Sequence, residues 1–202
     1  GVGLVEAVMR VARVATERID LREHEGSHPR IGALDVVPFA PVGDAPMDGA
    51  VELARTCGHR LGTEERLPVY LYEQAATRPD RMDLSHLRRG QFEGLFHRLG
   101  RDPDWSPDFG PSRVHPTAGA TAVGARPVLV AFNVNLRDDD LEVAQRVARQ
   151  VRSSSGGFPG VKAMGVRLDT EGRAQVSMNL VAHEITGLLA LYTAVEILAK
   201  EE

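Results

Sequence analysis

Apolar residues recur every three or four positions at the start of the chain, which is the spacing of an amphipathic helix. The pattern ends near Ile19 and is carried by a set of apolar residues: Leu4, Val8, Val11 and Ala15. Arginine and glutamate residues occupy the other faces. We therefore expect a helix over residues 4–19 that buries the face containing these four side chains.

Short branched runs alternate with a second helical pattern in the rest of the first half. Residues 31–39 and 67–72 are apolar and rich in β-branched or aromatic side chains, which predicts two strands. The helical period of residues 47–61 predicts a helix between them. Residues 73–112 are rich in turn formers, and we expect a long connector there with short helical turns at 84–99. Connectors of this length often carry function.

The second half shows a cleaner succession of patterns. The predicted elements run in the order strand, helix, hairpin and helix, at residues 127–136, 138–151, 161–181 and 184–200. Asp138 and Asp139 offer N-caps for the first of these helices. The resulting order β-α-β-β-α contains the first five elements of a ferredoxin-like β-α-β-β-α-β unit.

These elements predict a mixed α/β (α+β) protein built from two ferredoxin-like α/β subdomains with a ligand channel between them. We place the N-terminal subdomain and the connector at residues 1–124, and the C-terminal subdomain at residues 125–202. The first half then has the order α-β-α-β, which is consistent with an open α/β unit that lacks its opening strands. The chain starts with Gly-Val-Gly and enters a helix almost at once. We therefore expect either a processed protein or a piece of a longer one.

The composition is that of an ordinary globular protein, with 43% hydrophobic and 26% charged residues among 202. A net charge of -4 does not favour nucleic acid or an anionic membrane as a partner. The single cysteine, Cys57, excludes an intrachain disulfide and fits a reducing compartment. The sequence contains no apolar run of membrane-span length and no signal segment. We therefore expect a cytoplasmic protein.

A pentapeptide between the first helix and the first strand matches a zinc-protease signature. Residues 24–28 read HEGSH, which fits H-E-x-x-H. A zinc site of this kind needs both histidines on one helix, one turn apart, so that they point at the same ion. Gly26 and the serine after it are poor helix formers, and Pro29 biases His28 toward extended geometry. We therefore expect no metal site here, and a metal hydrolase is the least favoured of our hypotheses.

The end of the same pentapeptide suits different chemistry. Histidine is well suited to general acid–base catalysis at neutral pH, and His28 lies at the mouth of a predicted strand. Arg30 is able to hold a carboxylate through a bidentate contact. The alternative is a surface histidine and a surface arginine in a turn.

A glycine-rich segment, GATAVGAR at residues 119–126, precedes the strand of the second half. It resembles a phosphate-binding loop in part, but it lacks the lysine and the serine or threonine of that motif, and it precedes a strand instead of following one. We therefore do not expect nucleotide binding. Its glycine backbone is able to approach a flat ligand closely, and a tight turn between subdomains is the alternative.

Five stretches of the chain form long and specific motifs. The first is HPRIGALDVVPFAPV at residues 28–42. Four more follow: LPVYLYEQAA at 67–76, DFGP at 108–111, GATAVGARPVLVAFNVNL at 119–136 and AQVSMNL at 174–180. The first stretch resembles the pattern H-P-R-M/I-G-A-x-D-V-x-P-F-x-P of the glutamate formiminotransferase family. Because the similarity spans nearly the whole chain, the chain is identified as a member of that family.

The resemblance implies an activity and a set of site residues. The implied reaction transfers a formimino group from N-formimino-L-glutamate to N5 of tetrahydrofolate, the co-substrate, in histidine degradation, and no metal takes part. His28, in the H-P-R motif, is implied as the catalytic acid–base. The implied folate site is the Gly-Pro segment: Gly110, Pro111, Ser112, Arg113, Val114, His115, Pro116, Thr117, Ala118 and Gly119. Arg30 and Arg126 are candidate partners for the carboxylates of the substrate and of the folate tail. The family also suggests a homodimer.

The chain departs from the family pattern in three places. Family members carry further residues before the point where this chain begins, and a closing strand after Glu202. In the implied folate loop, His115 and Ala118 stand where the family often has an apolar residue and a tryptophan. The alternatives are therefore a catalytically impaired homologue that binds folate without turnover, and formyl transfer from N-formylglutamate.

Overall fold

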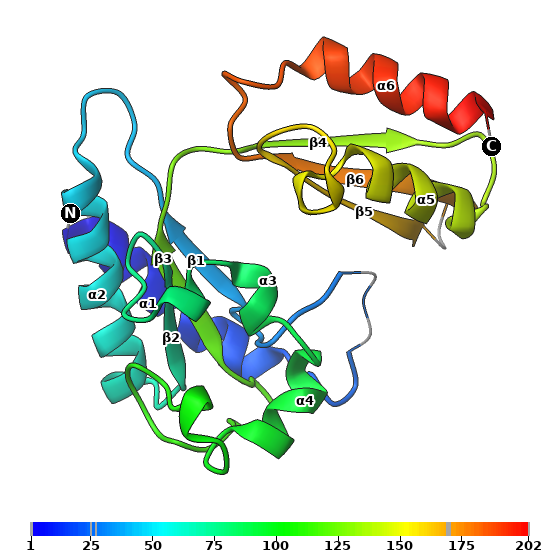
Figure 1. Cartoon of the computed structure of the whole chain (residues 1–202). Coiled ribbons are helices and arrows are strands. Elements are labelled where there is room, and N and C mark those ends of the chain that lie inside the picture. Colours follow the sequence, from blue (N-terminus) through cyan, green and yellow to red (C-terminus); the bar gives the residue numbers. More distant parts are fainter. Residues whose placement is uncertain (1, 25, 27, 169–170, 202) are drawn as a thin grey trace. The chain divides into compact units, whose positions relative to one another are not determined.

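The computed structural model describes residues 2–24, 26, 28–168 and 171–201, and the chain divides into two units, Gly1–Pro127 and Val128–Glu202. A parallel three-stranded sheet lies at the centre of the first unit (Figure 1). Its strands are β1 (Val36–Phe39), β2 (Val69–Glu73) and β3 (Thr121–Ala125), in the order β1-β3-β2. Parallel strands of one sheet need crossover connections, and a helix lies in the connection between β1 and β2, which flank β3 on either side.

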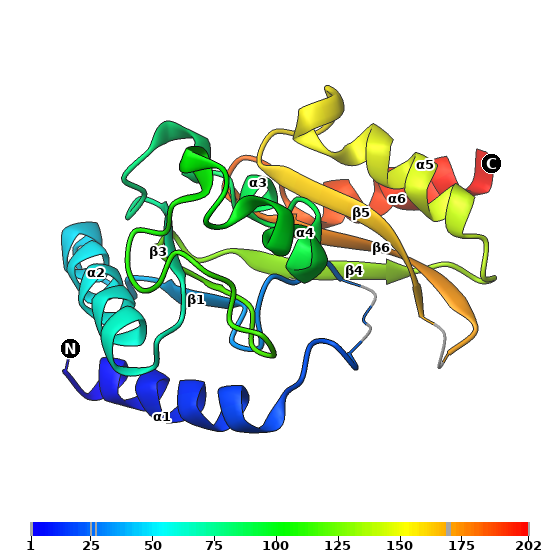
Figure 2. The ribbon, with the colours of Figure 1, turned by 90° about the horizontal axis from the view of Figure 1, so that it is seen from below.

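Two helices cover one face of this sheet. They are α1 (Val2–Arg18) and α2 (Met47–Glu64), and they pack against each other (Figures 1 and 2). The side of α2 that faces the sheet is made of small residues, among them Ala54, Cys57 and Gly58. Small side chains allow the helix to approach the strands closely, and the shared core includes Leu71 and Val123.

The apolar face of α1 is shifted by one position from the face that the spacing predicts. Val5, Met9 and Ala12 are buried, whereas Leu4 and Val11 are 59% and 58% exposed. The prediction was wrong because the helix is apolar over a wide arc, so two neighbouring stripes fit the same period. Contact with α2 then selects the stripe that contains Met9.

Short helical segments cover the other face of the sheet. They are η1 (Pro79–Arg81), α3 (Leu84–Leu87), α4 (Gln91–Arg98) and η2 (Pro103–Trp105), so the expected connector with short helical turns is confirmed. Trp105 anchors them, because its ring stacks on His86 at 6.0 Å and meets the edge of Tyr70 at the same distance. The guanidinium of Arg98 lies 4.6 Å from the ring centre of Trp105.

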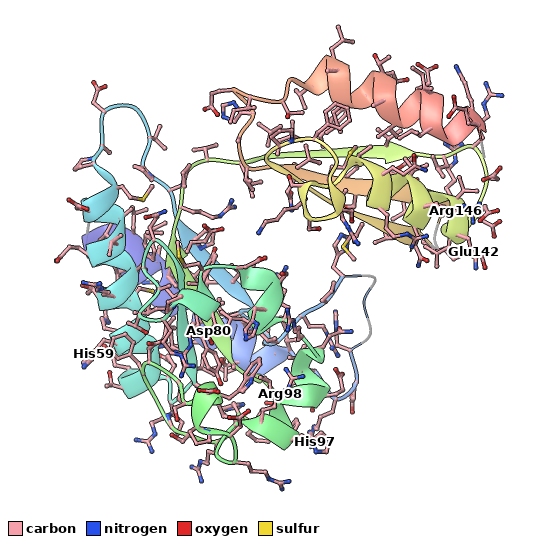
Figure 3. The ribbon with its side chains drawn as sticks, viewed as in Figure 1. His59, Asp80, His97, Arg98, Glu142 and Arg146 are labelled. Carbon is pink, nitrogen blue, oxygen red and sulfur yellow. The ribbon has the colours of Figure 1, made fainter. Side chains whose placement is uncertain are left out.

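The second unit is an antiparallel sheet with two helices. Its strands are β4 (Val130–Asn135), β5 (Val161–Leu168) and β6 (Arg173–Leu180), in the order β4-β6-β5. The helices are α5 (Leu141–Val151) and α6 (Leu188–Glu201), and a short turn, η3 (Ser153–Ser155), follows α5. One core joins both helices to one face of the sheet. On the surface of α5, Glu142 and Arg146 form an ion pair at 3.6 Å (Figure 3).

The predicted mixed α/β class with two subdomains is confirmed, and so is the order β-α-β-β-α of the second unit. Three details differ. The described strands of the first unit are parallel, whereas a ferredoxin-like sheet is antiparallel. The central strand β3 was missed and read as a glycine-rich loop. The N-cap of α5 is Asp140, which accepts a hydrogen bond from the Val143 N–H at 3.0 Å, and not Asp138 or Asp139.

Among the described residues, no helix combines the length and the apolar character that a membrane crossing requires.

Candidate functional site

The segment that carries His28 connects α1 to β1 and is folded on itself by Asp35. The backbone N–H of Ile31 donates to Oδ1 of Asp35 at 2.8 Å. Asp35 has a left-handed φ of 47°, and its other carboxylate oxygen pairs with Arg88. The predicted strand therefore begins only at Val36, because the residues before it form this turn. His28 is exposed at the start of the turn.

The loop at residues 110–119, the implied folate loop, is joined to that segment through backbone hydrogen bonds. Leu21 donates to the carbonyl of Thr117 at 2.9 Å, and Ala33 donates to that of Ala118 at 3.0 Å. In return, the N–H of Ala120 donates to the carbonyl of Ile31 at 2.9 Å. The structure thus brings together the two stretches that the sequence proposes as catalytic segment and folate loop.

Two glycines allow this approach. A Cβ at Gly32 would lie 1.8 Å from the carbonyl oxygen of Ala120, and one at Gly119 would lie 2.1 Å from that of Ile31. Gly119 also has a φ of 68°, which side chains disfavour. A larger residue at either position would push the two segments apart.

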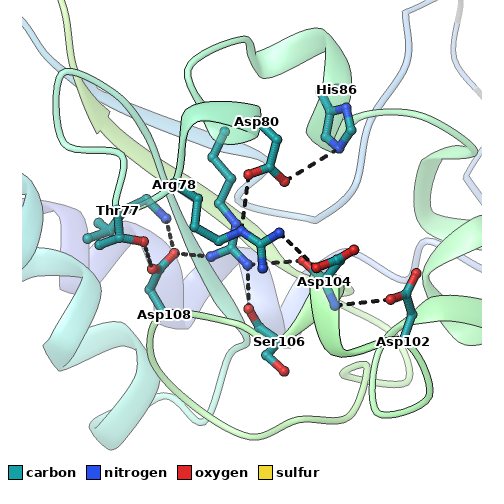
Figure 4. A network of polar contacts seen from close by, with 10 residues as sticks. Thr77, Arg78, Asp80, His86, Asp102, Asp104, Ser106 and Asp108 are labelled. Carbon is teal, nitrogen blue, oxygen red and sulfur yellow. Dashed lines mark hydrogen bonds and ion pairs between the residues drawn. The ribbon is translucent and has the colours of Figure 1, made fainter.

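The other end of the loop is held by a buried ion pair (Figure 4). Asp108 accepts hydrogen bonds from Arg81 at 2.6 Å and from the backbone N–H of Leu71 at 2.8 Å, and also from the hydroxyl of Thr77. Arg81 donates in addition to the carbonyl of Ser106 at 2.6 Å. The side chains of Arg81 and Asp108 are only 3% and 9% exposed. Asp108 therefore fixes the strand β2 and the start of the loop relative to each other.

Arg30 lies between the His28 segment and α4, where it is already paired. Its guanidinium donates to Glu93 at 2.8 and 3.1 Å, to Gln91 at 3.2 Å and to the carbonyl of His24 at 2.8 Å. The hydrogen bonds from Arg30 lower the pKa of the Glu93 carboxyl. Glu93 thus occupies the bidentate position that the sequence suggested for a ligand carboxylate.

His115 is a half-buried imidazole inside the loop. Its Nδ1 accepts a hydrogen bond from the backbone N–H of Ala118 at 3.0 Å, so the neutral ring carries its proton on Nε2. Burial lowers the pKa of His115. At neutral pH the loop therefore presents an uncharged N–H donor at this position.

The remaining members of the predicted loop differ in exposure. Ala118 and Gly119 are buried and Gly110 is exposed. The exposed side chains are Ser112, Arg113 and Pro116, and the half-buried ones are Pro111, Val114 and Thr117.

Arg126 directly follows β3, and its N–H donates to the carbonyl of Phe39 at 3.1 Å. On the neighbouring strand, the ring of Tyr72 lies across Gly124, where a Cβ would be 2.5 Å from it. Burial raises the pKa of the Tyr72 hydroxyl, and the positive charge of Arg126 acts in the opposite direction. Arg126 and Tyr72 thus lie together at the carboxyl end of a parallel sheet, where α/β proteins commonly bind ligands.

The two histidines of HEGSH do not share a helix, which an H-E-x-x-H zinc site requires. His24 and His28 lie after the end of α1 and outside any helix, while positions 25 and 27 of HEGSH lie outside the described residues. His59 and His97 are on separate helices, α2 and α4 (Figure 3). Within the described part of the chain, no three metal-binding side chains gather at one point.

Two family models match the chain. The N-terminal subdomain of the formiminotransferase domain matches residues 2–126, and the formiminotransferase domain model matches residues 131–202. The chain belongs to the formiminotransferase family. The resemblance drawn from the motifs is thereby confirmed.

Curated relatives of this family are similar along almost all of the chain. Glutamate formimidoyltransferase of Streptococcus pyogenes serotype M1 is 44% identical over 96% of the chain and 65% of its own length. The protein of the same name from Thermoplasma acidophilum is 42% identical over 96% of the chain and 64% of its own length. Formimidoyltransferase-cyclodeaminase of Sus scrofa is 45% identical over 94% of the chain and 36% of its own length. The chain thus spans slightly less than two thirds of the two glutamate formimidoyltransferases.

Sequence reasoning missed the residues that hold this candidate site in place. Asp35, Tyr72 and Asp108 all lie inside the family motifs. The partners of the two aspartates, Arg88 and Arg81, lie in the part of the connector that no motif covers. The pairs Asp35–Arg88 and Asp108–Arg81 join residues far apart in the chain, so only the fold reveals them. In the sequence, the only sign of their importance was that each aspartate lies within a motif.

Proposed function

We propose that this chain carries the formimidoyl-transfer site of a glutamate formimidoyltransferase, with N-formimino-L-glutamate as donor and tetrahydrofolate as acceptor. The names of the relatives support this reaction. The observation that carries the proposal is the set of backbone hydrogen bonds between the His28 segment and the loop at residues 110–119. These hydrogen bonds support the proposal, because they join the segment that contains His28 to the loop that we propose as the folate site.

His28 acts as general acid and base in this proposal. N5 of tetrahydrofolate attacks the formimino carbon and gives its proton to His28. The bond from that carbon to the glutamate nitrogen then breaks, and the nitrogen receives a proton from His28. One histidine thus returns to its starting state in each cycle, and binding both reactants together makes the transfer effectively intramolecular.

The other proposed site residues bind and orient the reactants. The loop at residues 110–119 contacts the folate, and His115 offers its Nε2 proton to an acceptor atom. Arg126 holds a substrate carboxylate at the carboxyl end of the sheet. Arg30 takes the same role only when a ligand carboxylate displaces Glu93 from the Arg30 guanidinium or binds to that guanidinium beside Glu93. We propose further that the enzyme works as a homodimer in the cytoplasm.

Replacing His28 with alanine tests the mechanism, and His24→Ala is the matched control from the same exposed turn. We expect His28→Ala to lower kcat by about a hundredfold or more, since general acid–base catalysis contributes about that much. The Kd for 5-formyltetrahydrofolate, a stable folate analogue, should stay unchanged. His24→Ala should keep full turnover. Unchanged turnover in His28→Ala would remove His28 from the mechanism.

The same assay separates the alternatives. Folate binding without turnover by the unaltered chain would favour the catalytically impaired homologue. Faster turnover with N-formyl-L-glutamate than with N-formimino-L-glutamate would assign the formyl donor instead.

A further inference from the structure

The hydroxyl of Tyr72 is buried without a hydrogen-bond partner. Tyr72 is 1% exposed, and its oxygen makes no hydrogen bond to any described residue. Burial raises the pKa of this hydroxyl, so it keeps its proton at neutral pH and remains a donor. A buried donor without an acceptor costs free energy, and such groups are rare in native proteins. The packing of the first unit therefore leaves this hydroxyl unexplained.

Tyr70, two residues earlier on β2, shows that the same face of the sheet is able to satisfy a tyrosine. Its ring is equally buried, and its hydroxyl donates to the carbonyl of Trp105 at 2.8 Å. Side chains alternate along a strand, so Tyr70 and Tyr72 lie on the same face. The missing partner is thus specific to position 72, near the carboxyl end of β2.

A glycine on the neighbouring strand makes room for the Tyr72 ring. Tyr72 pairs with Gly124 in the register of β2 and β3, which lie side by side in Figure 1. A Cβ at Gly124 would lie 2.5 Å from two ring carbons of Tyr72. A glycine inside a strand often marks such a close approach. The ring therefore extends over β3, and only a glycine at position 124 permits this.

The groups around the hydroxyl offer charge but no acceptor that it uses. Arg126 and Arg88 act on it through their positive charges, and a guanidinium contains no acceptor atom. The carboxylate of Glu73 acts on it as well, but no hydrogen bond joins the two. The Nε–H of Arg88 is a second buried donor without a partner among the described residues. Unused donors thus gather here, which favours the binding of an anion.

Arg126 is the group of this set that a ligand is able to reach. Its side chain is half-buried, and it forms no ion pair with any described residue. Positions 124 and 126 share one face of the chain by strand alternation, so the Arg126 side chain starts beside the Tyr72 ring. Arg30, in contrast, is already paired with Glu93. A ligand carboxylate is therefore able to bind Arg126 without breaking an existing ion pair.

We propose that Tyr72 donates its hydroxyl proton to a ligand carboxylate that Arg126 holds. The half-buried Arg126 side chain turns toward the ligand, and one carboxylate oxygen then reaches the hydroxyl while the other stays on the guanidinium. The two donors accept a carboxylate and reject a carboxamide, whose N–H groups would face them. Tyr72 is thus a specificity-determining residue.

This contact rests on the proposed function, in which both reactants carry carboxylates. The shared chemistry has two sources, the glutamyl group of N-formimino-L-glutamate and the glutamate tail of folate.

The test compares Tyr72→Phe with Tyr70→Phe in the full chain. Each substitution removes one hydroxyl oxygen from an equally buried ring of the same strand. We expect Tyr72→Phe to raise the Kd of a glutamyl ligand about tenfold or more, because hydrogen bonds to charged groups are among the stronger ones. Tyr70→Phe should leave every Kd unchanged.

Urea denaturation separates a binding role from a structural one. Tyr72→Phe deletes an unsatisfied buried group, so its urea midpoint should stay the same or rise. Tyr70→Phe leaves the Trp105 carbonyl without its donor, so its midpoint should fall. A midpoint that falls as far in Tyr72→Phe as in Tyr70→Phe would assign the hydroxyl to the packing of the free protein and overturn the proposal.

Three ligands identify the source: N-formimino-L-glutamate, 5-formyltetrahydrofolate and 6-methyltetrahydropterin, which has no carboxylate. A higher Kd of Tyr72→Phe for N-formimino-L-glutamate assigns the contact to the donor. A higher Kd for 5-formyltetrahydrofolate, with an unchanged Kd for the pterin, assigns it to the folate tail. Unchanged Kd values for both glutamyl ligands, binding of neither to the unaltered chain, or an equal rise for the pterin would overturn the proposal.

Turnover distinguishes this proposal from the proposed function. The expected Kd shifts in a chain that transfers no formimino group would uphold the Tyr72 contact and reject the proposed function. Normal transfer with unchanged Kd values in Tyr72→Phe would reject the contact alone.

Discussion

At the scale of single residues, Gly32 decides whether the His28 segment reaches the loop. Its substitution by alanine would place a Cβ 1.8 Å from a backbone oxygen, which cannot yield as a flexible side chain does. We expect Gly32→Ala to lower the free energy of unfolding by about 2–4 kcal/mol, measured by urea denaturation.

Gly49 provides the control for this substitution. It lies exposed in the first turn of α2, and the nearest atom that a Cβ would meet is 4.0 Å away. Gly49→Ala should raise the free energy of unfolding by up to about 1 kcal/mol, since alanine favours helix. Similar effects of the two substitutions would contradict the close contact at Gly32.

Cys57 should resist thiol reagents in the folded protein. Burial raises the pKa of its thiol to about 11, and the positive charge of Arg60 acts in the opposite direction. The reactive species is the thiolate, so at pH 8 labelling should be slow in buffer and complete in denaturant. Fast labelling of the native chain would show that α2 opens readily.

The same thiol links stability to alkaline pH. The unfolded chain loses the Cys57 proton near its ordinary pKa, while the folded chain keeps it to about pH 11. The stabilising contribution is therefore complete below about pH 9 and is lost as the pH rises toward 11. We expect urea midpoints to fall more steeply over this range in the unaltered chain than in Cys57→Ala. Parallel curves would exclude Cys57 as a contributor.

At the scale of elements, the pair Arg81–Asp108 joins η1 to the start of the proposed folate loop. Arg81→Met leaves a buried carboxylate without its cation, and this typically costs about 3–5 kcal/mol. We expect such a loss in urea denaturation. Arg78→Met is the control. Arg78 pairs with half-buried Asp80 and exposed Asp104, so its replacement should cost about 1 kcal/mol or less. Equal losses would mean that the Asp108 network is not tightly held.

The sequence predicted those elements whose pattern is local. The β5–β6 hairpin and α5 follow from alternation and helical period in neighbouring residues. The strand β3 was missed because its residues, Thr121 to Ala125, are small and include a glycine. Such a strand is stabilised by its two parallel neighbours and not by its own preference.

The candidate site likewise has a part that the sequence predicts and a part that only the fold reveals. The motifs themselves mark His28 and the loop at residues 110–119. The position of Tyr72 beside Arg126 depends on the register of β2 and β3, and the contact of Asp35 with Arg88 joins residues 53 positions apart. A local sequence pattern cannot predict contacts between residues so far apart in the chain, so these two contacts become visible only in the fold.

At the scale of the whole molecule, each unit has its own hydrophobic core. A core cavity in one unit should therefore loosen that unit first. Met178 is 1% exposed, and Met178→Ala should cost about 2–5 kcal/mol. Hydrogen exchange should then speed up in β4, β5 and β6 and stay unchanged in β1, β2 and β3.

Leu71→Ala, at an equally buried site of the first unit, should give the reverse pattern. Faster exchange in both sheets after either substitution would show that the two cores unfold as one.

The His28 segment and the loop at residues 110–119 are joined by hydrogen bonds between backbone atoms, and this bears on how the family can diversify. Peptide groups are the same at every position, so the exposed side chains of Ser112, Arg113 and Pro116 can change through evolution without breaking these hydrogen bonds. A lineage is thus able to alter the ligand it accepts while Gly32 and Gly119 stay fixed. The same division suggests a mutant library for changing specificity, randomised at the exposed positions 112, 113 and 116 and constant at the two glycines.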